Sequence, residues 1–115
     1  MKKLSNVGVG DVTIENVTPT VEFVAKLTGI ALEDLVLLGS AGKTLRSGDI
    51  DIAVEYPKYD DESIHYELVE FLGADHCHYN HGLKIGSYAV PIAGDRENGL
   101  VQVDLMYVRN VEWAE

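Results

Sequence analysis

The spacing of apolar residues predicts two helices. The first begins at Pro19, with Thr18 as its N-terminal cap, and ends at Gly29. The second begins near Asp61 and ends at Gly73. Their apolar positions recur at the three- and four-residue intervals that place side chains on one face of a helix. In the first helix these are Val21, Val24, Ala25 and Leu27, and in the second they are Ile64, Leu68, Val69, Phe71 and Leu72.

Between and after the helices, apolar runs bounded by Gly, Pro and Asp predict β-strands. Residues 1–17 are a weakly patterned lead-in with a short strand expected between Val7 and Ile14, and residues 42–47 are expected to form a short helix or a turn. The pattern predicts an α/β (α+β) fold class, in which a small mixed sheet of about five strands has helices packed on it. Residues 1–115 are expected to form a single domain. The predicted strands are 34–38, which is expected to be buried, 49–55, 76–80, 83–92 and 100–108.

The strand 49–55 carries the most informative polar positions. Side chains alternate between the two faces of a strand, so Asp49 and Asp51 share one face while the apolar residues between and after them lie on the other. Two like charges at such neighbouring positions repel each other, and a bound cation offsets that cost. Asp104 is a third carboxylate, set in the apolar strand 100–108, where a lone charge needs a partner. If the two strands are neighbours, the three carboxylates predict a site for two divalent metal ions.

A turn suited to phosphate precedes the first two carboxylates. An apolar run is followed by Gly39 and Ser40. A glycine lets the backbone approach a phosphate closely, and backbone amides at such a turn can point at the anion. Lys43 and Arg46 lie between this turn and Asp49, where their charges can offset that of a triphosphate. The segment therefore predicts a nucleotide-binding turn beside a metal site.

The order of these motifs resembles the DNA polymerase β-type nucleotidyltransferase superfamily. The resemblance implies that the three carboxylates are catalytic and bind two Mg²⁺ or Mn²⁺ ions, and that the Gly-Ser turn binds a nucleoside triphosphate. It also implies transfer of a nucleotidyl group to a hydroxyl acceptor with release of pyrophosphate. The resemblance covers roughly residues 18–108, and residues 46–52 and 103–106 are most similar to phage-encoded members. The motif residues are Gly39, Ser40, Asp49, Asp51 and Asp104.

The nucleotide-binding set implied by the resemblance also includes Lys43, Arg46 and Ser47. Many small members place a serine directly before the first aspartate, whereas Gly48 separates Ser47 from Asp49 here. Most members continue into a helical domain, so a helical partner domain or chain is expected to pack on an exposed apolar patch. That patch is expected at Tyr107, Val108, Val111 and Trp113.

A second class of function stays open, an antitoxin-like minimal nucleotidyltransferase that acts mainly as a binding or regulatory module for a helical partner protein. The formal net charge of −10 suits a basic partner and argues against extensive nucleic-acid binding by this chain alone. No apolar run approaches the length of a membrane span, and no apolar signal core follows Met1. A cytoplasmic location without a membrane partner is therefore expected.

Two further motifs partly resemble a P-loop and a zinc site, but neither has the full set of residues in the required arrangement. Residues 42–44 resemble the end of a P-loop, but Leu37 stands where that loop needs its first glycine. The His-Cys-His run at residues 76–78 offers zinc ligands, but alternation along a strand places the cysteine on the face opposite the two histidines. Structural zinc is therefore disfavoured. His65, in the second predicted helix, is expected at the solvated surface.

Overall fold

The order of strands in the sheet places distant parts of the sequence side by side. The structure is a computed structural model and describes residues 9–10, 12–38, 46–47, 49–56 and 58–109. β4 and β7 run parallel and the other neighbouring strands are antiparallel, so the sheet is mixed and confirms the α/β (α+β) class. Among the described residues, five strands form this sheet, called the main sheet below, in the order β2 (Val36–Leu38), β4 (Asp49–Glu55), β7 (Leu100–Val108), β6 (Ile85–Pro91) and β5 (Cys77–Asn80).

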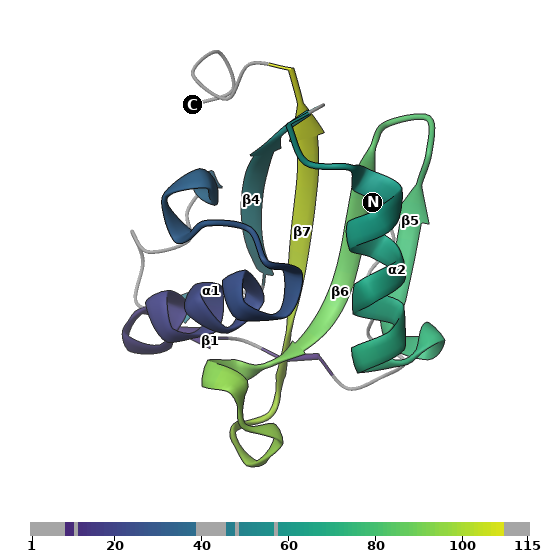
Figure 1. Cartoon of the computed structure of the whole chain (residues 1–115). Coiled ribbons are helices and arrows are strands. Elements are labelled where there is room, and N and C mark those ends of the chain that lie inside the picture. Colours follow the sequence, from purple (N-terminus) through teal and green to yellow (C-terminus); the bar gives the residue numbers. More distant parts are fainter. Residues whose placement is uncertain (1–8, 11, 39–45, 48, 57, 110–115) are drawn as a thin grey trace.

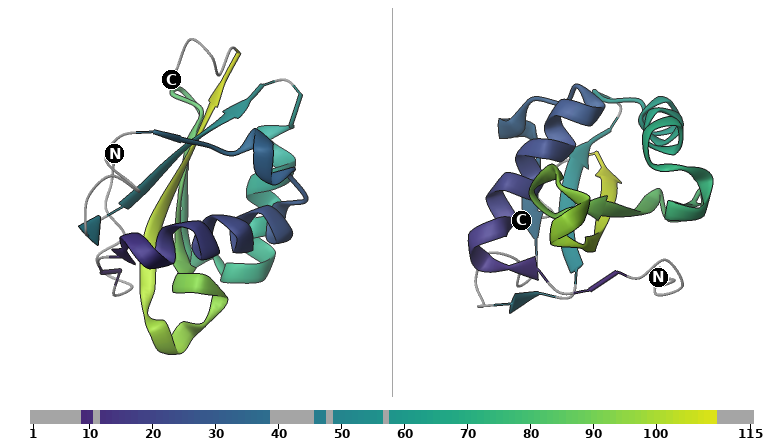
Figure 2. Two further views of the ribbon diagram at one scale, coloured as in Figure 1. Left: turned by 90° about the vertical axis from the view of Figure 1, so that its left-hand side faces the viewer. Right: turned by 90° about the horizontal axis from the view of Figure 1, so that it is seen from below.

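Both α-helices of the described chain, α1 (Ile14–Thr28) and α2 (Asp61–Leu72), lie on the same side of the main sheet (Figure 1). Figure 2 shows the sheet from two further directions, with both helices again on one side of it. The hydrophobic core fills the space between these two layers, and its burial is the main source of stability. The central strands contribute Ile50, Ile52, Val54, Val101, Val103 and Leu105, which are all at most 1% exposed.

The helix α1 begins five residues, which is more than one turn, earlier than predicted. Its first residue is Ile14, so Pro19 lies inside the helix and Thr18 is not its cap. A proline inside a helix removes one backbone hydrogen bond. The additional turn buries Val17, which is 2% exposed, and this apolar contact offsets that loss. The helix ends as predicted at Gly29, whose φ of 74° is a left-handed conformation that favours glycine.

The helix α2 has the predicted bounds because its ends carry local signals. The side chain of Asp60 accepts a hydrogen bond from the backbone N–H of Ser63 at 3.1 Å, which caps the first turn. The next residue, Asp61, does not cap the helix and is only 4% exposed. Its carboxylate accepts a hydrogen bond from the hydroxyl of Tyr79 and another, at 3.4 Å, from Nζ of Lys84. This buried carboxylate ties the start of α2 to the hairpin of β5 and β6.

The central strands β4 and β7 have their predicted bounds, whereas the outer strands are shorter. β2 is preceded by the short 3-10 helix η2 (Leu32–Asp34) and lies at the edge of the main sheet. Leu37 in β2 is 38% exposed, so the prediction that this strand is buried was wrong. β6 begins only at Ile85 because Lys84 has a left-handed φ of 53°. Further 3-10 helices are η3 (Ala74–His76), η4 (Ile92–Gly94) and η5 (Arg96–Asn98).

Two short strands pair apart from the main sheet. β1 (Val12–Thr13) and β3 (Arg46–Ser47) are antiparallel partners. Residues 46–47 are thus extended, contrary to the helix or turn expected there. Residues 42–45 lie outside the described residues, as does most of the lead-in, in which Val9 forms a bridge with Leu100.

The surface differs from the expected one at the C-terminal end of β7. Tyr107 is 5% exposed and belongs to the core, so the apolar patch expected there for a helical partner is absent at this residue. Val111 and Trp113 lie outside the described residues. The large exposed aromatic side chains of the described part are Tyr66 and Phe71 on α2, 65% and 56% exposed. No helix in the described ranges is both long and apolar enough to span a membrane.

His65 is not the solvated surface residue that its position in an acidic helix suggested. It is half-buried, its Nδ1 lies 3.0 Å from the hydroxyl of Tyr88, and its ring stacks on Tyr79. Burial lowers the pKa of His65, and the charges of His81 and His78 lower it further. The histidine therefore belongs to an aromatic network between α2 and the β5–β6 hairpin.

Candidate metal centre

The parallel pairing of β4 and β7 brings the three predicted carboxylates together. Asp51 lies opposite Asp104 in the register, and Asp49 lies opposite Gln102. Because alternate residues of a strand share a face, these side chains project from the face of the main sheet opposite the helices. One oxygen of each carboxylate lies within 4.8 Å of the other two. The predicted convergence of Asp49, Asp51 and Asp104 is confirmed.

The donor set fits a small divalent cation. Carboxylate oxygens are the hard ligands that Mg²⁺ and Mn²⁺ prefer. Two oxygens that bind one Mg²⁺ lie at most about 4.2 Å apart, twice a metal–oxygen distance of about 2.1 Å. The limit of 4.8 Å therefore places the three oxygens within a small side-chain rotation of a shared ion. Among the described residues, no other group of three or more His, Cys, Asp or Glu side chains converges in this way.

The three carboxylates differ in their exposure to solvent. Asp49 and Asp51 are half-buried, whereas Asp104 is only 5% exposed. A buried carboxylate is costly unless it is hydrogen-bonded or binds a cation. Solvent therefore reaches Asp49 and Asp51 on β4 more readily than Asp104 on β7.

Gln102 supplies a hydrogen bond to the most buried carboxylate. Its Nε2 donates to Oδ1 of Asp104 at 3.1 Å, and Gln102 itself is only 2% exposed. The two residues share a face of β7 because they are two positions apart. Sequence reasoning missed Gln102. The available signal was a single amide side chain in an apolar strand, two residues before the third aspartate.

Ser87 is a second polar residue that sequence reasoning missed. It lies opposite Asp104 in the antiparallel pairing of β6 with β7, so both side chains project from the same face. Ser87 is 0% exposed, and its hydroxyl has no hydrogen-bond partner among the described residues. Nothing in the local sequence of β6 distinguishes Ser87, because its proximity to Asp104 depends on strand pairing.

The predicted nucleotide-binding residues fall mostly outside the described part of the chain. Gly39, Ser40 and Lys43 are not among the described residues. Arg46 and Ser47 form β3, which pairs through its backbone with β1. β2 nevertheless ends at Leu38, which lies opposite Asp51 in the main sheet. The role of the predicted Gly-Ser turn stays a prediction.

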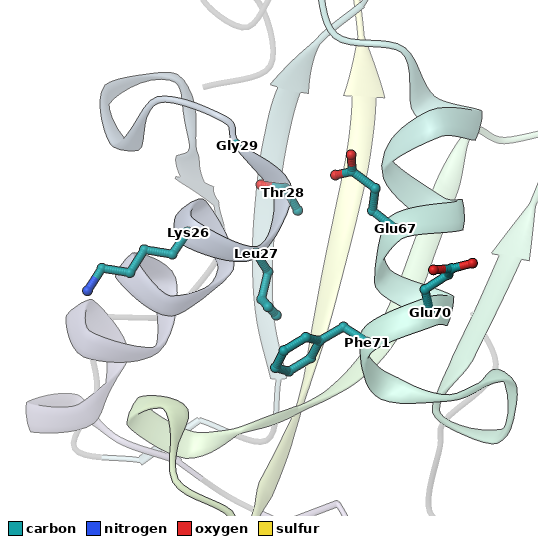
Figure 3. A pocket seen from close by; sticks show the side chains of 7 residues that line it. All are labelled: Lys26, Leu27, Thr28, Gly29, Glu67, Glu70 and Phe71. Carbon is teal, nitrogen blue, oxygen red and sulfur yellow. The ribbon is translucent and has the colours of Figure 1, made fainter.

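A groove of about 520 Å³ lies elsewhere, between the C-terminal part of α1 and α2 (Figure 3). The rings of Phe71 and Phe23 make an edge contact near it, and Glu67 and Glu70 lie along α2. The groove belongs to the helical side of the molecule, whereas the carboxylates project from the opposite face of the main sheet. It carries none of the three carboxylates, and its lining residues are Lys26, Leu27, Thr28, Gly29, Glu67, Glu70 and Phe71.

Comparison of the chain with models of protein families, with curated proteins and with solved structures finds no match.

Proposed function

We propose that this protein is a metal-dependent nucleotidyltransferase that moves a nucleotidyl group from a nucleoside triphosphate to a hydroxyl acceptor and releases pyrophosphate. The observation that carries the proposal is the convergence of Asp49, Asp51 and Asp104 from two parallel strands, with one oxygen of each within 4.8 Å of the others. The sequence supports it independently, because a Gly-Ser turn precedes the Asp-x-Asp strand in the order typical of polymerase β-type nucleotidyltransferases.

The carboxylates have distinct roles in this proposal. Asp49 and Asp51 would hold one Mg²⁺ or Mn²⁺ ion, and Asp104 would share a second ion with them. Bound ions would neutralise the charge of the triphosphate and make the acceptor hydroxyl more acidic. The open side of the site, along β4, suits entry of the triphosphate, because Asp49 and Asp51 are the more exposed carboxylates.

The proposed reaction is a displacement at the α-phosphorus of the triphosphate. The acceptor oxygen forms a bond to this phosphorus, and the bond from phosphorus to the bridging oxygen of pyrophosphate breaks. Asp104 accepts the proton of the acceptor hydroxyl and later releases it to solvent. Backbone amides after Gly39, with Lys43 and Arg46, are assigned to the triphosphate by the sequence resemblance alone.

The test uses the purified chain with each α-labelled nucleoside triphosphate and Mg²⁺ or Mn²⁺. Binding is measured first, because it needs no acceptor, and labelled products are then sought with protein, RNA and small hydroxyl compounds as acceptors. We expect metal-dependent binding of a triphosphate and transfer of label, both lost in Asp49→Asn and Asp104→Asn. Asp75→Asn is the matched control, because Asp75 is exposed and lies on η3. Metal-independent binding, or equal transfer by all the variants, would contradict the proposal.

A further inference from the structure

Two buried, uncharged polar side chains flank Asp104. Gln102 lies two residues before it on the same face of β7, and Ser87 lies opposite it on β6. Gln102 is 2% exposed and Ser87 is 0% exposed. Polar side chains are uncommon at the fully buried centre of a sheet, because each must find hydrogen-bond partners there. Asp104 thus has a polar neighbour along its own strand and another across the sheet.

The contact with Gln102 restricts how Asp104 can turn. A carboxylate free of contacts can rotate about its Cβ–Cγ bond. The bond of 3.1 Å from Nε2 of Gln102 holds Oδ1 of Asp104 in one direction. Since Gln102 also lies opposite Asp49 in the register, its side chain occupies the same face between two members of the carboxylate cluster.

Ser87 provides a second observation that points to a ligand. Its hydroxyl is fully buried and has no hydrogen-bond partner within the described residues, although a hydroxyl can both donate and accept. Buried hydroxyls without a partner are rare in folded proteins, and a bound water molecule or ion is one of the explanations for them. The hydroxyl projects from the same sheet face as the Asp104 carboxylate. A hydrated cation held by that carboxylate would bring water molecules that could bond Oγ of Ser87.

We infer that Gln102 and Ser87 are positioning residues of the metal centre, which hold Asp104 and the hydration shell of its cation in place. This inference rests on the metal site of the proposed function, but not on nucleotidyl transfer. Gln102 fixes the plane of the carboxylate that binds the ion. Ser87 bonds a water ligand of the same ion. Residues that orient metal ligands typically contribute a factor of about 10 to 100 to metal affinity.

The test measures metal binding by the full chain without nucleotide. The variants are Gln102→Met, which keeps the length of the side chain and removes its donor, and Ser87→Ala. Thr20→Val is the matched control, because Thr20 is 0% exposed and lies on α1, away from the carboxylates. Its hydroxyl donates to the backbone oxygen of Asn16 and accepts from the backbone N–H of Ala93 on η4. Mn²⁺ affinity is measured by electron paramagnetic resonance, in which the signal reports the concentration of free Mn²⁺. The luminescence lifetime of bound Eu³⁺ in light and heavy water reports how many water molecules the ion retains.

We expect Gln102→Met to lower Mn²⁺ affinity by about tenfold or more and to leave more water molecules on bound Eu³⁺. Without the hydrogen bond from Gln102, the carboxylate of Asp104 can turn away from the ion, and water then takes its place as a ligand. Ser87→Ala should lower Mn²⁺ affinity by a smaller factor and yet raise the melting temperature of the metal-free protein, because it removes a buried hydroxyl without a partner. Thr20→Val should lower the melting temperature and leave Mn²⁺ affinity unchanged.

Unchanged Mn²⁺ affinity in both Ser87→Ala and a folded Gln102→Met would overturn the inference. If Gln102→Met does not fold, unchanged affinity in Ser87→Ala is sufficient to overturn it. Absence of Mn²⁺ binding by the wild-type chain would also overturn it. The expected pattern of Mn²⁺ affinities without any nucleotidyl transfer would support the inference and count against the proposed function alone.

Discussion

Asp51 and Asp104 lie opposite each other on neighbouring parallel strands, although more than fifty residues separate them in the chain. Side chains that face each other across two strands have Cβ atoms about 5 Å apart. Two like charges in that position weaken a sheet unless something between them compensates. The pairing of Asp51 with Asp104 is therefore the relationship on which the candidate metal centre depends, and Asp49 extends it along β4.

Removing one charge of the cluster should stabilise the metal-free protein and weaken metal binding. Two unit charges about 4 Å apart in water repel each other by about 1 kcal/mol. We expect Asp49→Asn to raise the free energy of unfolding of the metal-free protein by about that amount and to abolish the stabilisation that Mg²⁺ with a triphosphate provides. Thermal melts with and without these ligands measure both effects. An equal ligand-induced shift in Asp49→Asn and wild type would contradict this prediction, and Asp75→Asn is the control.

Gly86 should tolerate no side chain, because the ring of Tyr88 lies over it. A Cβ added at Gly86 would lie 2.7 Å from both Cε2 and Cζ of that ring. Gly86→Ala must displace Tyr88 and with it the contact to Nδ1 of His65. We expect a loss of about 1 to 3 kcal/mol in the free energy of unfolding, measured with urea. Gly82→Ala is the control, since its nearest contact would be Asn80 Oδ1 at 3.4 Å, and equal effects of the two changes would refute the packing argument.

Mild acid should destabilise the protein through His65. Burial lowers the pKa of this imidazole in the folded protein, with further lowering by His81 and His78. At this position the unfolded chain binds a proton more readily than the folded protein does. The contribution of neutral His65 to the free energy of unfolding is therefore complete above the unfolded pKa of about 6.5, and it is lost as pH falls through the lower folded pKa.

Thermal melts from neutral to mildly acidic pH test the role of His65. We expect the melting temperature of the wild type to fall across this range, and the fall to be smaller in His65→Gln. His76→Gln is the matched control and should keep the wild-type fall, because His76 lies on η3 and is not among the groups that lower the pKa of His65. If His65→Gln loses as much stability with pH as the wild type, His65 is not the group responsible.

Cys77 should react slowly while the protein is folded. Burial raises the pKa of its thiol to about 11, so little thiolate is present near pH 8. An unfolded cysteine has a pKa of about 8.5, so we expect alkylation by iodoacetamide to be on the order of a hundredfold slower in the folded protein. Mass spectrometry with and without denaturant measures the two rates. Rapid labelling of the folded chain would contradict the burial of Cys77.

The sequence alone determined the elements whose signals are local. The bounds of β4, β7 and α2 follow from alternation within each strand, from the cap at Asp60 and from the break at Gly73. The shared face of Asp49 and Asp51 follows from alternation as well. These features depend only on neighbours a few residues apart, so the order of residues was sufficient to predict them.

Tertiary structure decided which elements meet. It placed β7 between β4 and β6, which joined Asp104 to Asp51 and brought Ser87 beside it. It also extended α1 by more than one turn, buried Tyr107 and left His65 only half-exposed to solvent, against the sequence-based expectation. The physical reason is that strand pairing and burial are contacts between residues far apart in the chain, whose free energy depends on the completed core. Periodicity along the chain shows which face a side chain occupies, and only the packed sheet shows what lies opposite.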